Sequence, residues 1–390
     1  MATKVTRNDH PQRLRLIGSI NEVSKDQWDS CAGEENPFLS HDFLSILEDS
    51  GSVCAKTGWL PQHLVYEDRN GTLLGAVPLY LKGHSYGEYV FDWGWADAFE
   101  RAGHQYFPKL LSAVPFTPVT CSKLLTRPGE NRSKLNQILI AGLVSATEQL
   151  KVSSLHVNFL LPNESELLGR TKFLTRNGLQ YHWCNANYAS FDEFLSHLNS
   201  RKRKNIRKER RAAAAHGVTI SALTAEEIEE RHWDAFYSFY IDTSDRKWGG
   251  AYLNKQFFRL LGKKMADKVL LIMAEYDGVP VGGALNFIGK DTLYGRNWGC
   301  TSDFKFLHFE ACYYQAIDFA IKKGLRRVEA GAQGNHKFQR GYLPKLTHSS
   351  HYIVDAGFRE AVAEFLMKER EHIVLERNAL EKMSPFKQES

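Results

Sequence analysis

The stretch from Thr292 to Pro344 reads TLYGRNWGCTSDFKFLHFEACYYQAIDFAIKKGLRRVEAGAQGNHKFQRGYLP and decides our prediction of the fold. Thr292 to Trp298 is rich in aromatics and β-formers, which predicts a strand. From Phe309 to Lys323 apolar residues recur at helical spacing, and Gly324 ends the predicted helix. Arg327 to Ala330 predicts a second strand. This order indicates an α/β fold with a polar loop after the second strand, where open α/β sheets bind ligands.

Polar side chains gather in this loop, and an Arg lies inside the first strand. An Arg in an apolar strand needs a ligand or a buried carboxylate as its partner. The loop residues either recognise an anionic group or the substrate, or they form a solvated loop. The residues that we expect to bind substrate or acyl donor are Arg296, Trp298, Gln333, His336, Lys337, Arg340 and Tyr342.

An internal repeat indicates that the fold is duplicated. HLVYEDRNGTLLGAVPLY (63–80) resembles LLIMAEYDGVPVGGALNF (270–287), and both show the apolar run, turn dipeptide and apolar run of a β-hairpin. Trp93-Gly94 matches Trp298-Gly299 at a similar offset. Because each hairpin precedes an amphipathic helix and a strand, we predict two α/β domains with mixed sheets.

The bulk properties agree with two soluble domains. The chain has 390 residues, of which 43% are hydrophobic and 24% charged. We expect an N-terminal domain at 14–180, a C-terminal domain with the active site at 188–360, and a helix and tail at 361–390. The join between the halves is expected near 178–190.

The sequence shows no targeting or membrane-spanning signal. The N-terminus has no apolar run, and no stretch approaches 18 apolar residues. The six cysteines form no CxxC pair, which favours reduced thiols in a cytoplasm and argues against a metal site.

One segment carries most of the positive charge. The run from Arg201 to Arg211 has eight Lys or Arg and one Glu, a net +7, while the whole chain has a net charge of +5. A helix with this charge either contacts phosphate or forms a solvated basic face. The residues that we expect to bind phosphate are Arg203, Lys204, Arg207 and Lys208.

The stretch HFEACYYQAIDFAIKKGLRRVEAGAQGNHKFQRGY (308–342) resembles the signature of the FemAB-like family of GNAT-superfamily acyltransferases. NSRKRKNIRKERR, KWGGAYLNKQFF, TLYGRNWG and PFTPVT extend the resemblance, which covers most of 14–350. It implies tandem GNAT-like acyl-CoA N-acyltransferase domains. It also implies that the pantetheine of an acyl-CoA lies between splayed strands, here 292–298 and 326–330.

Acyl transfer to an amine needs a polarised carbonyl and a base for the amine proton. The base residues that we expect are Glu310, Glu329 and His308. Each has a structural alternative: Glu310 could complement a helix dipole, Glu329 could pair with an Arg, and His308 could cap a helix. The implied reaction takes an acyl group from acyl-CoA to a small-molecule or peptide-like amine.

Two departures from the family pattern keep other functions open. The segment before the helix, SDFKFLHFE, has no glycine to grip a pyrophosphate, and the first half reads TPVTCSK where Gly-Pro-Arg is expected. A Fem-like transfer from aminoacyl-tRNA to a cell-wall-type precursor is the second hypothesis, with the basic run contacting tRNA. A non-catalytic binding protein on this fold is the third.

Overall fold

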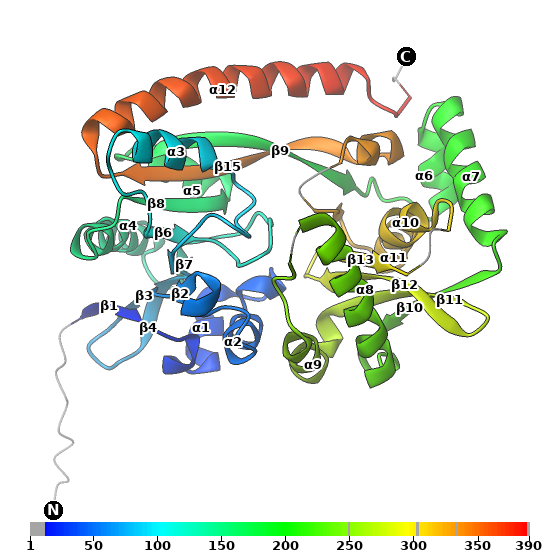
Figure 1. Ribbon diagram of the computed structural model, residues 1–390, viewed down its shortest axis with the longest axis horizontal. Coiled ribbons are helices and arrows are strands. Elements are labelled where there is room, and N and C mark those ends of the chain that lie inside the picture. The colour runs from blue at the N-terminus through cyan, green and yellow to red at the C-terminus, as the bar shows by residue number, and fades with distance from the viewer. Residues whose placement is uncertain (1–11, 249, 302–303, 332–333, 388–390) are drawn as a thin grey trace, which may run out of the picture. The chain divides into compact units, whose positions relative to one another are not determined.

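The computed structural model describes residues 12–248, 250–301, 304–331 and 334–387 (Figure 1). They form two compact units, and each is described by itself. Unit 1 takes residues 12–34, 38–177 and 348–369, and unit 2 takes 35–37, 178–347 and 370–387. The units are discontinuous, so residues 348–360 fall in unit 1 although they lie within the expected range 188–360. The expected ranges stay predictions of separately folding domains.

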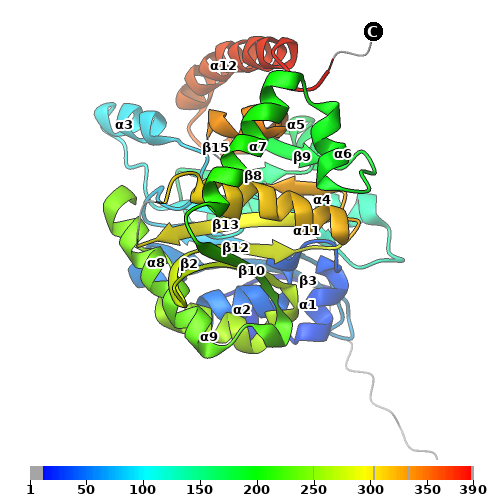
Figure 2. The ribbon, with the colours of Figure 1, turned by 90° about the vertical axis from the view of Figure 1, so that its right-hand side faces the viewer.

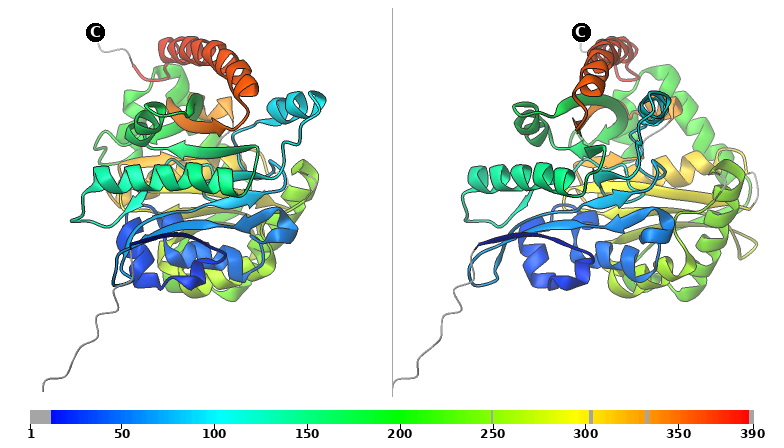
Figure 3. Two further views of the ribbon diagram at one scale, coloured as in Figure 1. Left: turned by 90° about the vertical axis from the view of Figure 1, so that its left-hand side faces the viewer. Right: turned by 60° about the vertical axis from the view of Figure 1, so that its left-hand side comes forward.

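Unit 1 contains two sheets and a long covering helix. The first sheet is antiparallel with the order β1-β3-β4-β7, and the second has the order β15-β8-β6-β5-β2. Helix α4 (Arg132–Gln149) packs on β3, β4 and β8 and lines the main core of this unit (Figure 3). The strands are β1 (Arg13–Ile17), β2 (Trp59–Pro61), β3 (His63–Glu67), β4 (Leu73–Val77), β5 (Tyr80–Lys82), β6 (Lys109–Ser112), β7 (Leu125–Thr126), β8 (Ser154–Leu160) and β15 (Leu343–Ile353). The other helices are α1 (Lys25–Ala32), α2 (His41–Asp49), α3 (Trp93–Arg101), α5 (Pro162–Gly169) and the first part of α12 (Ala356–Lys382).

Unit 2 has one sheet with helices on both faces. Its strand order is β10-β11-β12-β13-β14-β9, and only the pairing of β13 with β14 is parallel among the strand pairs described there. Figure 2 shows α11 and α8 on different sides of β12 and β13. The strands are β9 (Leu174–Cys184), β10 (Val218–Thr224), β11 (Val269–Tyr276), β12 (Val279–Ile288), β13 (Thr292–Cys300) and β14 (Arg327–Glu329). The helices are α6 (Phe191–His197), α7 (Ser200–Ala214), α8 (Glu230–Trp248), α9 (Lys255–Lys264), α10 (Leu307–Phe309), the π-helical turn η6 (Glu310–Tyr314), α11 (Gln315–Lys322) and the 3₁₀ turn η7 (Asn335–Arg340).

Turn chemistry explains the two hairpins, which lie where the repeat predicts them. Asp277 and Gly278 have φ of 50° and 75°, which a two-residue hairpin turn requires and Asp-Gly tolerates. In the first hairpin Gly71 has φ of 79°, and Asp68 Oδ1 accepts the N–H groups of Asn70 and Thr72 at 2.8 Å each. The core order hairpin, strand, helix, strand is therefore present in both units.

Helix α8 packs so closely on the sheet of unit 2 that the strand beneath it must have glycine at position 299. A Cβ atom on Gly299 would lie 2.3 Å from the carbonyl oxygen of Phe239 in α8, closer than atoms can approach. Gly283, beside it in the register, faces Phe236 of the same helix. These two glycines let α8 pack directly on the backbone of β12 and β13.

One expectation from the repeat is corrected. Trp93-Gly94 begins helix α3, whereas Trp298-Gly299 lies in strand β13, so the two dipeptides are not equivalent. The strand equivalent to β13 is β7, since β7 pairs with β4 as β13 pairs with β12. The boundary between the units lies at 177/178, at the start of the expected join at 178–190, and strand β9 runs through it to Cys184.

Candidate functional site

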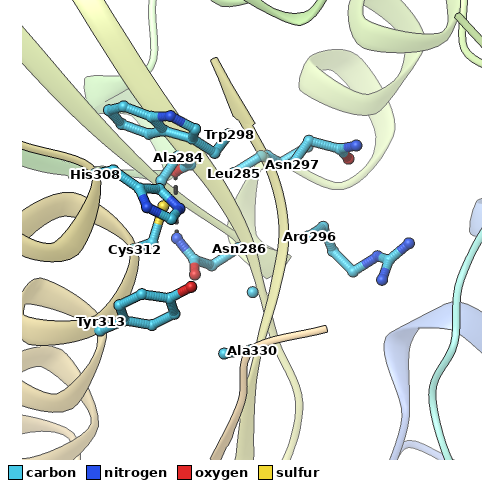
Figure 4. A pocket seen from close by; sticks show the side chains of 11 residues that line it. Ala284, Leu285, Asn286, Arg296, Asn297, Trp298, His308, Cys312, Tyr313 and Ala330 are labelled. Carbon is cyan, nitrogen blue, oxygen red and sulfur yellow. Dashed lines mark hydrogen bonds between the residues drawn. The ribbon is translucent and has the colours of Figure 1, made fainter. Parts of the chain in front are cut away.

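The strands β13 and β14 pair briefly and then separate. Their parallel pairing covers Thr292–Tyr294 with Arg327–Glu329, where β14 ends, while β13 continues to Cys300. A cavity of about 90 Å³ opens beyond this point. Figure 4 shows its lining side chains, which include Asn286, Arg296, Trp298, His308, Cys312 and Tyr313.

Irregular backbone borders the cavity on two sides. The register between β12 and β13 slips at Asn286, where Leu285 faces Asn297 but Asn286 faces Gly295, so Arg296 is an extra residue in a β-bulge. On the opposite wall the helix contains the π-helical turn η6, which carries Cys312 and Tyr313. Bulges and π turns re-aim side chains and are common at functional sites.

The cavity walls bring a ring system, a thiol and an amide together. The rings of His308 and Trp298 lie 5.5 Å apart, as do those of His308 and Tyr313. The buried Asn286 donates from Nδ2 to the carbonyl oxygens of Ala284 (3.2 Å) and Leu270 (3.3 Å). In Figure 4 the side chains of Arg296 and Asn297 extend to the other side of β13 from His308.

Glu329, at the end of β14, is a buried carboxyl group whose charged form receives little stabilisation from neighbouring groups. Burial raises its pKa to about 7, although Arg327 acts against this shift. Arg327 Nε lies 3.3 Å from Oε1 but donates instead to Thr292 Oγ1 at 3.2 Å, and His182 Nδ1 is 3.8 Å away. Among the described residues neither carboxylate oxygen accepts a hydrogen bond. A carboxyl group that titrates near neutral pH could serve as a base.

The charge of Arg296 acts on two buried groups near the end of β14. Its positive charge acts against the raised pKa of Glu329 and adds to the lowering of the pKa of Lys337. Glu329, Arg296 and Lys337 therefore share one electrostatic environment at the end of β14.

Glu310 is occupied by an ion pair rather than directed at the cavity. Arg210 in α7 donates to both carboxylate oxygens, at 2.9 and 3.1 Å, and Gln315 donates at 2.8 Å. Arg210 also contacts Asp318 at 2.8 Å. Glu310 thus anchors the basic helix to η6 and does not line the cavity.

Of the expected binding residues in the loop after β14, His336 contacts the cavity wall and Lys337 is buried. His336 Nε2 lies 2.8 Å from the hydroxyl of Tyr313 in the cavity wall. Lys337 is 4% exposed, donates from Nζ to the carbonyl of Gly331 at 3.0 Å, and has a pKa lowered to about 8 by burial. Gln333 lies outside the described residues.

Arg340 and Tyr342 have buried contacts that favour structural roles. Arg340 Nη2 lies 2.9 Å from both carboxylate oxygens of Glu209, its Nε donates to Tyr314, and its guanidinium lies over the Phe309 ring at 3.5 Å. The fully buried hydroxyl of Tyr342 donates to the carbonyl of Tyr313 at 3.4 Å. Both side chains hold η7 against the helix that lines the cavity.

The basic run forms one continuous helix, α7, with two faces. Its inner face supplies Arg210 and Glu209, which fix it to η6 and η7. Arg203 is half-buried and donates to the carbonyl of Ser196 at 3.4 Å. The exposed cations on its outer face are Arg201, Lys204, Arg207, Lys208 and Arg211. Of these, Arg207 pairs with the exposed Asp192 at 2.9 Å.

Several cavity residues were absent from the sequence prediction. Cys312, Tyr313, Asn286 and Asn297 line the cavity beside the predicted Arg296, Trp298 and His308. One signal for Cys312 was present, since it lies four residues after His308 and such residues share a helix face. Nothing local marked Asn286, whose position depends on the bulge.

Neither a metal-binding cluster nor a membrane-spanning helix is found among the described residues. Among them, no group of three or more His, Cys, Asp or Glu side chains is arranged to hold a metal ion. No helix in the same part of the chain is both long and apolar enough to cross a bilayer.

Comparisons with known structures give the fold. FemX matches with a TM-score of 0.54 at 12% identity, over 90% of this chain and 100% of the other. The L-PGS of Bacillus licheniformis matches with a TM-score of 0.51 at 9% identity, over 86% and 98% of the two chains. A tandem GNAT protein from the clavulanic acid biosynthesis pathway aligns over 87% and 98% at 9% identity, with a TM-score of 0.48. The fold is a duplicated, mixed α/β fold similar to that of FemX, which agrees with the duplicated α/β fold that the sequence predicts.

Sequence comparison gives the family. No curated protein sequence matches this chain. The model of the FemAB-like family, described as peptidoglycan biosynthesis/recognition, matches residues 19–388. Because this match covers nearly the whole chain, the protein belongs to the FemAB-like family.

Proposed function

We propose that this chain is an aminoacyltransferase that moves an aminoacyl group from charged tRNA to an amine of a peptidoglycan-type precursor. Membership of the FemAB-like family supports a transferase of the acyltransferase type. The observation that carries the proposal is the cavity where β13 and β14 separate. Because charged tRNA is a cytoplasmic donor, the reaction requires a cytoplasmic location.

The cavity offers the parts that acyl transfer needs. Beyond Tyr294 the edge of β13 no longer pairs with β14, so its backbone groups are available to orient an acyl carbonyl. His308 in the wall is the residue that we assign to take the amine proton. Glu329 is the second choice because it is buried beside the strand end, and Glu310 is left out because Arg210 and Gln315 occupy it.

The size of the cavity favours a small acyl group. Its volume of about 90 Å³ is smaller than the roughly 150 Å³ of a protein cavity that holds benzene. We therefore propose that the preferred aminoacyl group has a small side chain. The ring of Trp298 forms part of the cavity wall.

The positive charge of helix α7 favours tRNA, a polyanion, as the carrier of the aminoacyl group. Its exposed cations extend from Arg201 to Arg211, about 15 Å along a helix at 1.5 Å per residue. Each strand of a nucleic-acid duplex carries a phosphate roughly every 3.4 Å along its axis, so this face spans about four phosphates of one strand. The ion pairs Arg210–Glu310 and Arg340–Glu209 fix α7 to the same segments that border the cavity.

Acyl-CoA is the second candidate donor. The opening between β13 and β14 is where the GNAT resemblance puts a pantetheine, which favours this donor. Against it, Phe304, Lys305 and Phe306 precede α10 where a pyrophosphate loop needs glycine, and Phe306 itself has φ of 67°. We therefore rank aminoacyl-tRNA first.

A donor comparison tests the proposal. The full chain is incubated with a lysine-containing muramyl pentapeptide and either tRNA charged with radiolabelled amino acids or radiolabelled acetyl-CoA. We expect label in an acid-stable peptide product with charged tRNA, and more with alanyl- or seryl-tRNA than with phenylalanyl-tRNA. Label from acetyl-CoA alone would make acyl-CoA the donor. No product with either donor would favour a non-catalytic binding protein.

A further inference from the structure

Strand β10 (Val218–Thr224) forms one end of the sheet of unit 2. It pairs with β11 along all of its 7 residues without a bulge, and no strand in the described part of the chain pairs with its other edge. The side chains of Thr219, Ser221 and Ala222 are exposed. An edge of this kind presents unpaired backbone N–H and C=O groups, to which another strand can bind.

The other ends of the two described sheets carry features that block such pairing. β1 contains Arg13 and Arg15, β7 has 2 residues, and β2 has 3 residues and ends at Pro61. Charge, short length and proline are the means by which proteins prevent sheet edges from pairing with another chain. The sequence of β10, VTISALT, has 7 residues and neither a charge nor a proline. Its edge is therefore suited to pair with a further strand.

Opposite charges lie at the two ends of β10. Helix α7 precedes it, separated by residues 215–217, and the exposed Lys208 and Arg211 lie in the last two turns of this helix. The 3₁₀ turn η4 (Ala225–Glu227) follows it directly and carries the exposed Glu226 and Glu227. A second β10 laid antiparallel beside the first would bring the basic end of each strand to the acidic end of the other. This charge complementarity favours an identical chain as the partner.

We propose that two copies of this chain form a dimer through β10, with the two strands antiparallel about a two-fold axis. The sheets of unit 2 in the two copies then form one continuous sheet. With the axis at the middle residue, Ser221 faces Ser221 of the second copy and Ile220 faces Ala222. An interface of this symmetry is closed, because each copy uses the same edge and no further copy can add to it. This proposal does not depend on the transferase reaction.

The oligomeric state in solution tests the proposal. Sedimentation velocity of the full chain over a series of concentrations should show a reversible dimer. Ser221→Lys puts two ammonium groups opposite each other across the axis, so the dissociation constant should rise by about tenfold or more, since like charges facing each other repel. The matched control Ser238→Lys makes the same change at an exposed serine of α8 and should leave the dimer unchanged. Thermal unfolding confirms that both variants are folded.

Disulfide trapping tests the register without adding charge. Facing residues of antiparallel strands have Cβ atoms about 5 Å apart, so mild oxidation should link two copies of Ser221→Cys. Thr219→Cys changes an exposed residue of the same strand, but its two copies would lie four residues apart, about 13 Å along the strands, and should not link. Linkage of Thr219→Cys without linkage of Ser221→Cys would overturn the proposed pairing.

A charge exchange tests the antiparallel arrangement. Glu226→Arg brings cations together and should weaken the dimer, and Arg211→Glu in the same chain should restore it. If the second change does not restore dimerisation, the antiparallel arrangement is wrong. A wild type that is monomeric at every concentration, or a Ser221→Lys that dimerises as strongly as Ser238→Lys, would overturn the proposal as a whole.

Discussion

The two units build the same core and use it differently. Unit 1 runs β3, β4, β7, α4, β8, and unit 2 runs β11, β12, β13, the α10–η6–α11 segment, β14. In unit 1 the helix is a regular α-helix and the third strand has two residues. In unit 2 the helix contains a π-helical turn, and the third strand has nine residues and extends past its partner to open a cavity.

The charged side chains show the same contrast. In unit 1 the fully buried Lys109 donates to Ser85 and Glu88 at 2.8 Å each and to Asp92 at 2.5 Å. Lys82, also fully buried, lies over the ring of Trp59 at 3.7 Å. Burial lowers the pKa of Lys82 to about 7 and raises that of Glu88 to about 7. This network ties the segment before α3 to the sheet. Unit 2 also has ion pairs, such as Arg340–Glu209, but the polar side chains of Asn286 and His308 line a cavity there.

We infer that duplication of the core leaves one copy free for chemistry. In the network of unit 1 the charges are buried with their partners, so removal of one partner leaves an uncompensated charge. In unit 2 a bulge and a π turn border a cavity whose wall groups a substrate could reach. Variants of both units test this division, beginning with the largest expected effect.

Replacing His308 should nearly abolish transfer. Loss of a general base lowers the rate by about 10²- to 10⁴-fold, so we expect a loss of this size in kcat for His308→Asn once the substrates are found. The matched control His216→Asn changes an exposed imidazole of unit 2 that does not line the cavity. The assignment of the base would be wrong if both variants turned over at similar rates with unchanged melting temperatures.

Lys109→Met should strongly destabilise unit 1. It leaves Glu88 and Asp92 buried without their main partner, and breaking a buried ion pair in this way lowers the free energy of unfolding by about 3–5 kcal/mol. Urea unfolding followed by fluorescence measures it. Lys134→Met, on the exposed first turn of α4, should stay within about 0.5 kcal/mol of wild type. If Lys109→Met lowered the free energy of unfolding only slightly, the structural role assigned to the network would be wrong.

Replacing Glu329 and replacing Glu310 should change the stability of the protein at pH 8 in opposite directions. The folded pKa of Glu329 is raised to about 7 from its ordinary value of 4.5, so the unfolded state loses its proton first and stability falls as pH rises from 4.5 to 7. Glu329→Gln should therefore be more stable than wild type at pH 8, by roughly 3 kcal/mol at 1.36 kcal/mol per pKa unit. The difference should vanish near pH 4.

Glu310→Gln is the matched control for this effect. It removes the carboxylate that pairs with Arg210 and should destabilise the protein at pH 8. Thermal unfolding at pH 4 and pH 8 compares both variants. A stabilising Glu310→Gln, or a Glu329→Gln whose effect does not change with pH, would contradict the two environments described for these groups.

Removing cations from α7 should weaken tRNA binding. Of the effects predicted here we expect this one to be the smallest, but it is specific to this helix. Each phosphate that the helix no longer neutralises should reduce the salt slope of log K by roughly 0.7 to 0.9. We expect Arg203, Lys204, Arg207 and Lys208 together changed to Ala to flatten the slope for uncharged tRNA. A variant of equal charge that replaces Arg259, Lys263, Lys264 and Lys268, all exposed in and just after α9, should keep it. Equal salt slopes for the wild type and the α7 variant would mean that α7 is a solvated helix that does not contact tRNA phosphates.

The sequence predicted the parts of this fold whose causes are local. The turn dipeptides Asn70-Gly71 and Asp277-Gly278 define their hairpins because positive φ there demands such residues. Helical periodicity likewise predicts a helix from Phe309 to Lys323, and in the structure the helical segment begins two residues earlier, at Leu307. Trp93-Gly94 misled because a matching dipeptide carries no information on whether it lies in a helix or a strand.

The cavity depends on distant contacts that no local pattern shows. Glu310 looked like a base because its partner Arg210 lies 100 residues away in the chain. Arg340 looked like a ligand-binding residue because its partner Glu209 lies 131 residues away. Cys312 was missed although it lies four residues after His308, because spacing alone does not reveal that this part of the helix lines a cavity.

Hydrogen exchange with a non-transferable donor tests the central claim most directly. The full chain is mixed with an amide-linked alanyl-RNA microhelix, which mimics charged tRNA but cannot pass on its alanyl group, and amide exchange is followed by mass spectrometry. We predict protection in β13 and in the segment from α10 to η6, with no change in β7 or α4 of unit 1. Protection of β7 and α4 instead, or of neither unit, would contradict a reaction centre in the cavity of unit 2.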